Sequence, residues 1–209
     1  MVFLPGFLGP PDAYQAEARA LSPHPVAALG LRGSPGCGVL ERGWTFEDFL
    51  ADLVFLAERL DFPRFLLSAY SANVPLALAY AARHPQRVRG LLLIDYPPRV
   101  LRPGVDWVRR MRKARPDLPE AALRGIASEF GPFDAGPLLS RVRAPVLILR
   151  GNPEQGGLLD EAEAEAMRTA LPEARVVNFP ESGHEIWDPD PEAYLDALKG
   201  FVATLEGRS

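Results

Sequence analysis

Three scarcities narrow the classes of protein to which this 209-residue chain can belong. Its one cysteine, Cys37, excludes an internal disulfide framework and fits a reducing compartment, so we expect a cytoplasmic protein. No apolar run is long and pure enough to cross a bilayer. A formal net charge of −4 gives no electrostatic reason to expect nucleic acid or a membrane surface as a partner, and we expect a small-molecule substrate instead.

Short apolar runs alternate with helical patterns along the chain. The apolar start, residues 1–6, has no basic leader, so we interpret it as a first core strand and not as a signal peptide. Most runs lack in/out alternation, as parallel strands buried on both faces do. The expected strands are residues 2–4, 26–31, 65–69, 91–95, 146–149 and 175–179, and the expected helices are residues 12–21, 45–60, 72–84, 160–171 and 191–205.

Repeated β-α-β units require a parallel sheet with right-handed crossovers. The sequence therefore predicts an α/β fold: a three-layer α/β/α sandwich around a mostly parallel sheet of about six strands. Strand patterning stops between about residues 96 and 144, where proline, glycine and arginine accumulate. We expect one domain over residues 1–209, with this segment inserted between two strands as a short helical lid.

Ser71 stands where the apolar run at residues 65–69 gives way to a helical pattern. A serine held at a sharp strand-to-helix turn projects its hydroxyl above the edge of the sheet, as in a G-x-S-x-G nucleophile elbow. Here Ala69 and Asn73 take the places of the two glycines, so the pattern is degenerate. We nevertheless predict Ser71 as the nucleophile.

The chain has three histidines, which allows the general base to be chosen by elimination. His24 precedes a strand and so lies at the wrong end of a parallel sheet. His84 closes the helix that follows Ser71. His184 comes just after the last expected strand, on the edge where Ser71 also emerges, and Gly183 allows a close backbone approach there. We therefore predict His184 as the base.

Two carboxylates are candidates for the acid that orients His184. Asp95 ends the strand after the elbow helix, and Glu154 follows the next strand in a turn rich in proline and glycine. Either residue gives the chain order serine, acid, histidine. We favour Asp95 because the end of a buried strand fixes a short side chain more rigidly, and Glu154 remains the alternative.

An oxyanion hole needs N–H donors near the nucleophile. Ala72 starts the helix after Ser71, where N–H groups have no partner within the helix. Residues 5–9, Pro-Gly-Phe-Leu-Gly, would supply a second donor, for which Phe7 is the best candidate.

The order of these motifs resembles the α/β-hydrolase superfamily over nearly the whole chain. Residues 5–9 are similar to its His-Gly-x-x-Gly segment, residues 31–36 to its Leu-Arg-Gly-His-Gly loop, and residues 69–73 to its elbow. The helix after the elbow, residues 149–151 and the Gly183-His184 pair also match. Three departures stand out: Pro5 replaces a histidine, Asn73 replaces a glycine, and Glu154 stands at the usual aspartate position. Some members carry the acid where Asp95 lies. The family's first two strands are expected to be missing, and the lid is short.

The resemblance implies a serine hydrolase that cleaves a small ester, thioester or amide-like substrate without a metal or an organic cofactor. A second reading is a C–C hydrolase or lyase with an anionic substrate, for which lid arginines such as Arg109 and Arg112 would bind the carboxylate. The alternative for this charge run, which we favour, is a solvated outer face of a lid helix. A third is a ligand-binding protein on the same fold without turnover. Tyr70, Tyr96 and Trp187 flank the proposed site and are candidates for lining its pocket.

Overall fold

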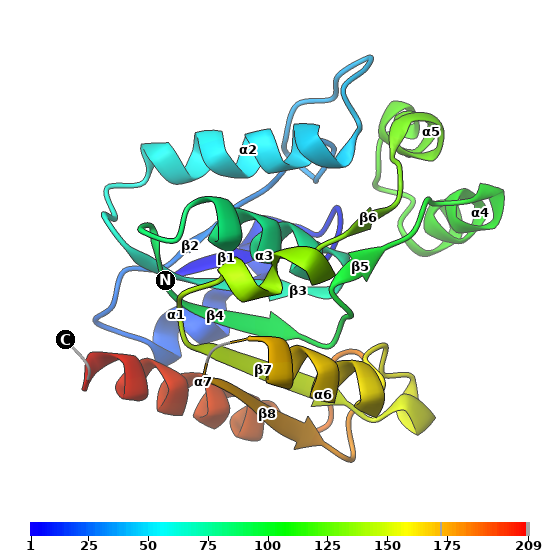
Figure 1. The fold of residues 1–209 in the computed structure, drawn as a ribbon. Helices are drawn as coiled ribbons and strands as arrows, with labels where there is room; N and C mark the ends of the chain where they lie inside the picture. The colour runs from blue at the N-terminus through cyan, green and yellow to red at the C-terminus, as the bar shows by residue number, and fades with distance from the viewer. Residues whose placement is uncertain (172, 208–209) are drawn as a thin grey trace.

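A single main sheet organises the protein, whose computed structural model describes residues 1–171 and 173–207 (Figure 1). All neighbouring strands in this sheet pair in parallel, so their carboxyl ends share one edge. In spatial order the strands are β2 (Ala27–Ala28), β1 (Val2–Leu4), β3 (Phe65–Tyr70), β4 (Val88–Ile94), β7 (Val146–Gly151) and β8 (Ala174–Phe179).

Helices cover both faces of the sheet and make the predicted three layers (Figure 1). The helices on one face are α2 (Phe46–Arg59), α3 (Val74–Arg83) and α6 (Glu161–Ala170), and those on the other are α1 (Gln15–Ala20) and α7 (Pro191–Glu206). Alternate residues of the central strands belong to two hydrophobic cores, one on each face of the sheet. In β4, Leu91 and Leu93 pack toward α2 and α3, whereas Leu92 and Ile94 pack toward α7. The predicted α/β sandwich is therefore confirmed.

The N-terminal units differ in detail from the expectation. The strand expected at residues 26–31 contributes only Ala27–Ala28, because its partner β1 is three residues long and ends before Pro5, which has no N–H. The helix expected at residues 12–21 is split at Tyr14, whose φ of −101° and ψ of 30° are not helical. The 3₁₀ turn η1 (Pro11–Ala13) precedes Tyr14 and α1 follows it. The Tyr14 ring instead stacks on Phe3 at 4.5 Å between centroids.

Helix caps follow the sequence signals. Thr45 and Asp48 form a complete capping box at the start of α2, as the Thr-x-x-Asp pattern predicts. Asp190 accepts a hydrogen bond from the Ala193 N–H at 3.0 Å and caps α7, which has Pro191 at its first position. These caps fix where the two longest helices begin, and the start of α7 lies beside the site described below.

Residues 96–144, which we call the insertion, connect β4 to β7. It contains a short antiparallel pair, two helices and a 3₁₀ segment: β5 (Arg99–Val100), α4 (Val105–Ala114), α5 (Glu120–Glu129), β6 (Phe133–Asp134) and η3 (Gly136–Arg141). In Figure 1, α4 and α5 stand beyond the carboxyl edge of the sheet, whereas η3 packs back on α3 and α6. The stretch without strand patterning thus covers the edge where Ser71 emerges.

The insertion is attached to the loop before α2. The Glu129 carboxylate at the end of α5 accepts hydrogen bonds from the N–H groups of Gly43 and Trp44 at 2.9 and 3.0 Å. Gly125 lies so close to the fully buried Trp44 that a Cβ there would be 2.1 Å from the indole ring. The close approach fixes α5 against the body of the protein. Across the described ranges no helix has the length and apolar character needed to span a bilayer.

Candidate active site

Ser71 occupies a strained turn between β3 and α3. Its φ is +60°, in the left-handed region that residues with a side chain rarely adopt. A single 3₁₀ turn, η2 (Ser71–Asn73), then leads into α3. The reversal sends the chain away from the sheet while the Ser71 side chain stays at the carboxyl edge, as the degenerate elbow sequence predicts.

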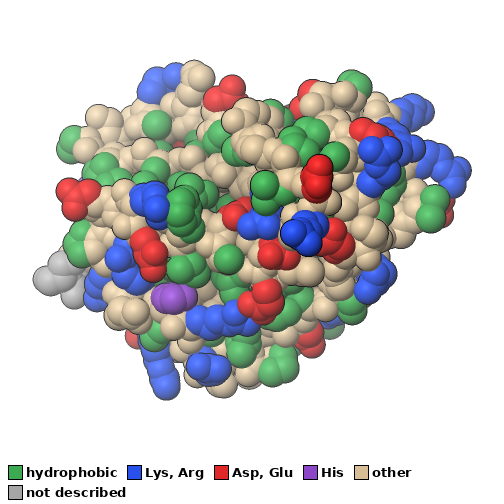
Figure 2. Space-filling model, turned by 90° about the horizontal axis from the view of Figure 1, so that it is seen from above, with side chains coloured by type: hydrophobic (Ala, Val, Ile, Leu, Met, Phe, Trp, Pro, Cys, Tyr) green, Lys and Arg blue, Asp and Glu red, His purple; other side chains and the backbone are tan. Residues whose placement is uncertain are grey.

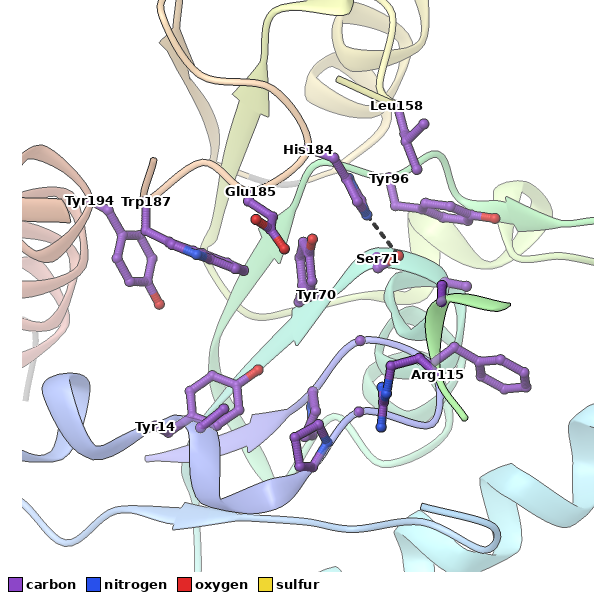
Figure 3. Close-up of a pocket in the computed structure, with 18 of the residues that line it drawn as sticks. Tyr14, Tyr70, Ser71, Tyr96, Arg115, Leu158, His184, Glu185, Trp187 and Tyr194 are labelled. Atoms are coloured by element: carbon purple, nitrogen blue, oxygen red, sulfur yellow. Dashed lines mark hydrogen bonds between the residues drawn. The ribbon is translucent and has the colours of Figure 1, made fainter. Parts of the chain in front are cut away.

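Ser71, His184 and Asp95 form one series of hydrogen bonds, of which Figure 3 shows the one between Ser71 and His184. The Ser71 Oγ lies 2.9 Å from Nε2 of His184, and Nδ1 of the same ring lies 2.9 Å from Oδ2 of Asp95. The imidazole also stacks on the Tyr70 ring, with 4.7 Å between centroids. The histidine is thus held on three sides, with one nitrogen directed at the serine hydroxyl.

Two glycines allow the loops that carry this series to approach each other. A Cβ on Gly183 would lie 2.2 Å from the carbonyl oxygen of Gln155, and one on Gly151 would lie 2.1 Å from that of Gly183. Any larger residue would push the loops after β7 and β8 apart. The glycine before His184 therefore has the close-approach role inferred from the sequence.

Asp95, and not Glu154, is the carboxylate in contact with His184. Asp95 is fully buried and has a φ of +45°. Its oxygens accept hydrogen bonds from the N–H groups of Gly151, Leu158 and Leu159 at 3.0, 2.9 and 3.3 Å, in addition to the bond with His184. Glu154 lies exposed in the turn η4 (Pro153–Gln155). The rigid strand end therefore holds the acid beside the histidine.

The residues predicted for the oxyanion hole lie beside Ser71. Ala72 and Phe7 both line the same cavity as Ser71 and His184. The Gly9 N–H donates to the Gly6 carbonyl at 2.5 Å, and Leu8 has a φ of +59°, so residues 6–9 form a tight turn. The hydrogen bond that closes this turn is donated by the Gly9 N–H. The N–H of Phe7, at the corner of the turn, takes no part in it.

Asn73 joins the elbow to this turn. Its side chain is 4% exposed, and Nδ2 donates a hydrogen bond of 2.7 Å to the carbonyl oxygen of Pro5. From the sequence, Asn73 is only a departure from glycine, and no motif indicates this contact. The asparagine bridges the two segments that carry Ala72 and Phe7, and so sets the spacing of the candidate donors.

Replacing Asn73 with Asp should separate these two segments. The carboxylate has the same shape but no N–H, and it would face the Pro5 carbonyl; a buried acceptor left without its donor costs about 1–3 kcal/mol. We expect a lower melting temperature and a lower kcat for Asn73→Asp than for wild type, measured by calorimetry and by ester hydrolysis. Asn152→Asp, which alters an exposed side-chain hydrogen bond to Pro180, is the control. An unchanged kcat in a destabilised Asn73→Asp protein would limit Asn73 to a role in folding.

A cavity of about 1000 Å³ opens over Ser71 and His184. Tyr70, Tyr96 and Trp187 all line it, as predicted from their place near the edge of the sheet. Burial raises the pKa of the Tyr96 phenol, and burial followed by the charges of Glu185 and Asp95 raises that of Tyr70. Both phenols are therefore neutral hydrogen-bonding groups in the ordinary pH range.

The two arginines singled out from the sequence lie outside this cavity. Arg109 pairs with Asp106 at 2.5 Å and Arg112 pairs with Glu120, both on the exposed side of α4. Basic side chains gather over α4 and α5, at the right-hand end of the face in Figure 2. The two that reach the cavity are Arg110 and Arg115. Trp107, Arg110, Met111 and Ala114 recur at helical spacing and face the cavity, whereas residues 109 and 112 fall between them.

The apolar stripe of α4 is therefore the sequence signal that places Arg110 on the face of the helix that lines the cavity. Other wall residues without a sequence signal lie far from Ser71 in the chain: Tyr14 just before α1, Glu17 in α1, Glu185 in the loop before α7 and Tyr194 in α7. Within residues 1–171 and 173–207, no group of three or more His, Cys, Asp or Glu side chains is arranged to hold a metal ion.

Known proteins share this fold. Residues 1–144 match the family described as the alpha/beta hydrolase fold. The chain belongs to this family and is an α/β-hydrolase enzyme. It is 25% identical over 204 residues to the 2-(acetamidomethylene)succinate hydrolase of Mesorhizobium japonicum, an alignment that covers 78% of this chain and 72% of that protein.

Two solved esterases have the same fold. A thermophilic esterase from Thermogutta terrifontis, in a malate-bound structure, is 21% identical with a TM-score of 0.77, over 98% of this chain and 89% of that chain. The esterase of Exiguobacterium antarcticum is 17% identical with a TM-score of 0.76, over 97% and 91%.

Proposed function

We propose that the protein is a serine hydrolase of small ester, thioester or amide-like substrates. In this mechanism Nε2 of His184 takes the proton of Ser71 as Oγ attacks the substrate carbonyl. Asp95 holds Nδ1 and stabilises the imidazolium that forms. The Phe7 and Ala72 N–H groups bind the oxygen that becomes negative. His184 then protonates the leaving group, and a water molecule activated by the same histidine releases the acyl group from Ser71.

The series of two 2.9 Å hydrogen bonds from Ser71 through His184 to Asp95 is the observation that carries this proposal. A serine beside a histidine becomes a nucleophile when a third group fixes the tautomer of the ring. Asp95 meets that need, because its three backbone donors and full burial hold it in one orientation. The strained φ of Ser71 supports the same reading, since strain persists where the surrounding structure requires it.

Labelling with a fluorophosphonate tests the proposal directly. The folded protein should gain one phosphonyl group, and peptide mass spectrometry should locate it on Ser71. His184→Ala should slow the labelling by about 100-fold or more, because general-base assistance contributes about 10²–10⁴-fold. Denatured protein is the control, in which Ser71 reacts no faster than other serines. No adduct at Ser71 in the folded protein would favour the ligand-binding protein without turnover.

An anionic substrate is the second candidate, now through Arg110 and Arg115. Arg110 lines the cavity and forms no ion pair with any residue that the structure describes, whereas Arg115 pairs with Asp117 at 2.7 Å. The name of the Mesorhizobium japonicum relative gives a succinate derivative as its substrate. A carboxylate bound by Arg110 would suit a hydrolase, and it would equally suit the C–C hydrolase or lyase reading with the same serine and histidine.

Arg110→Ala should discriminate a charged substrate from a neutral one. We expect its KM for 4-nitrophenyl hydrogen succinate to rise about tenfold or more, because a hydrogen bond to a charged group contributes about 1.5–3 kcal/mol. KM for neutral 4-nitrophenyl butyrate should stay near that of wild type. Arg109→Ala removes the same charge from the outer side of α4 and is the matched control. Equal changes in the two variants would remove Arg110 from substrate binding.

A further inference from the structure

The cavity over Ser71 has a second end, built by α1, α7 and the loop before α7. Besides small apolar side chains, the described residues of its wall there are aromatic rings and carboxylates, and none of them is lysine or arginine. Figure 3 shows Tyr14, Tyr194, Trp187 and Glu185 on one side of the cavity and Arg115 on the other. We call the wall formed by Tyr14, Glu17, Tyr70, Glu185, Trp187 and Tyr194 the acidic-aromatic end.

Glu17 is a buried carboxylate without a counter-charge. It is 7% exposed, and it accepts a hydrogen bond from the Tyr194 hydroxyl at 3.0 Å. It forms no ion pair with a residue in the described ranges, and neither does Glu185, which is exposed at the rim. Buried carboxylates are almost always paired, because an isolated charge loses its hydration. Because Glu17 lines the cavity, a cation bound in the cavity can pair with it.

The rings beside Glu17 supply a second attraction for a cation. Trp187 lies edge-on to Tyr70 at 4.9 Å and is tilted to Tyr194 at 6.0 Å, while Tyr14 stacks on Phe3. The faces of such rings carry negative potential and attract ammonium groups, most strongly when water is excluded. Burial and then the charge of Glu17 raise the pKa of both Tyr14 and Tyr194. Their phenols therefore stay protonated and neutral.

We propose that the acidic-aromatic end binds an organic ammonium group. The ammonium would lie against the rings of Trp187 and the tyrosines and neutralise Glu17, with Glu185 attracting it at the entrance. A ligand held in this way places its other end toward Ser71, since both lie on the wall of one cavity. The proposal deepens the proposed function by naming a substrate class, and it rests on that function only for the step at Ser71. Binding itself needs no turnover.

Calorimetry with choline, and with its neutral isostere 3,3-dimethyl-1-butanol, tests the proposal on the intact protein. Choline should bind at least about tenfold more tightly than the isostere, because only the cation gains from the carboxylates and ring faces. Glu17→Gln, which keeps an oxygen for the Tyr194 hydroxyl, should lower choline affinity about tenfold or more and leave the isostere unchanged. Trp187→Leu should weaken choline binding as well.

Glu161→Gln is the matched control. It removes one negative charge from the exposed start of α6, away from the cavity, and should leave choline affinity unchanged. Equal affinities of wild type for choline and the isostere would overturn the proposal, as would unaltered choline binding by a folded Glu17→Gln. Fluorophosphonate labelling reports separately on Ser71: choline binding without labelling would remove the hydrolase mechanism and keep the ammonium site.

Discussion

Ser71→Ala is expected to lower kcat for 4-nitrophenyl acetate on the order of 10⁴–10⁶-fold, the largest effect of any single change in this protein. The reaction would lose its nucleophile, and the remaining rate would come from binding and the Phe7 and Ala72 donors alone. Folding should survive, because the backbone and the Cβ of the elbow are unchanged. Initial rates and a melting curve on the same sample measure both.

Ser71→Gly separates chemistry from backbone strain. Glycine adopts a φ of +60° without the cost that a side chain adds, about 1–2 kcal/mol, so the variant should be as inactive as Ser71→Ala but melt higher. Ser140→Ala, an exposed serine in η3, is the control and should keep wild-type activity. Substantial turnover by both Ser71 variants would contradict the nucleophile assignment.

The fold could be predicted from the sequence because its central strands are buried on both faces. Continuous apolar runs at β3, β4 and β7 and the helices between them leave few topologies, and the shared carboxyl edge brings Ser71, Asp95 and His184 to one place. His184 followed from elimination among three histidines. The choice between Asp95 and Glu154 followed from rigidity, and the structure places Asp95 against the ring.

The residues of the cavity wall could not be predicted from the sequence, because they come together through contacts between distant segments. The charge run in the insertion favours Arg109 and Arg112, and only the direction of α4 against the sheet shows that Arg110 and Arg115 face inward. Glu17 is adjacent to no motif, and its importance appears only when Tyr194, 177 residues later, lies against it. Tertiary packing decides such positions, and no local pattern encodes them.

Asn73 shows why a departure from a family pattern was hard to interpret. From sequence, an asparagine in place of glycine indicates only that the elbow pattern is degenerate. In the structure its amide gives the Pro5 carbonyl a buried partner, and it links the elbow to the turn at residues 6–9. The Pro5 and Asn73 departures therefore meet in one hydrogen bond, which no reading of either motif by itself can reveal.

Asp95→Asn is expected to lower kcat about 10⁴-fold, through the tautomer of His184. An amide presents one acceptor oxygen and an NH₂ group, whereas the Asp95 carboxylate accepts four hydrogen bonds, two on each oxygen. If the NH₂ faces His184, it donates to Nδ1 and forces the proton to Nε2, which can then no longer accept one from Ser71. If it faces Gly151 and Leu159 instead, two buried N–H groups lose their partner.

In either orientation the NH₂ group faces at least one buried backbone N–H donor. The free energy of unfolding should therefore fall together with kcat. Each unmet buried group costs about 1–3 kcal/mol, which for a chain of this size corresponds to a fall in melting temperature of roughly 2–12 °C. The positive φ of residue 95 adds nothing to this loss, because asparagine tolerates that region well. Kinetics well below the melting temperature keep the two effects apart. Glu154→Gln, in the exposed turn after β7, should change neither quantity; if it abolished turnover while Asp95→Asn remained active, the orienting acid would be Glu154 and the contact seen at Asp95 would be structural.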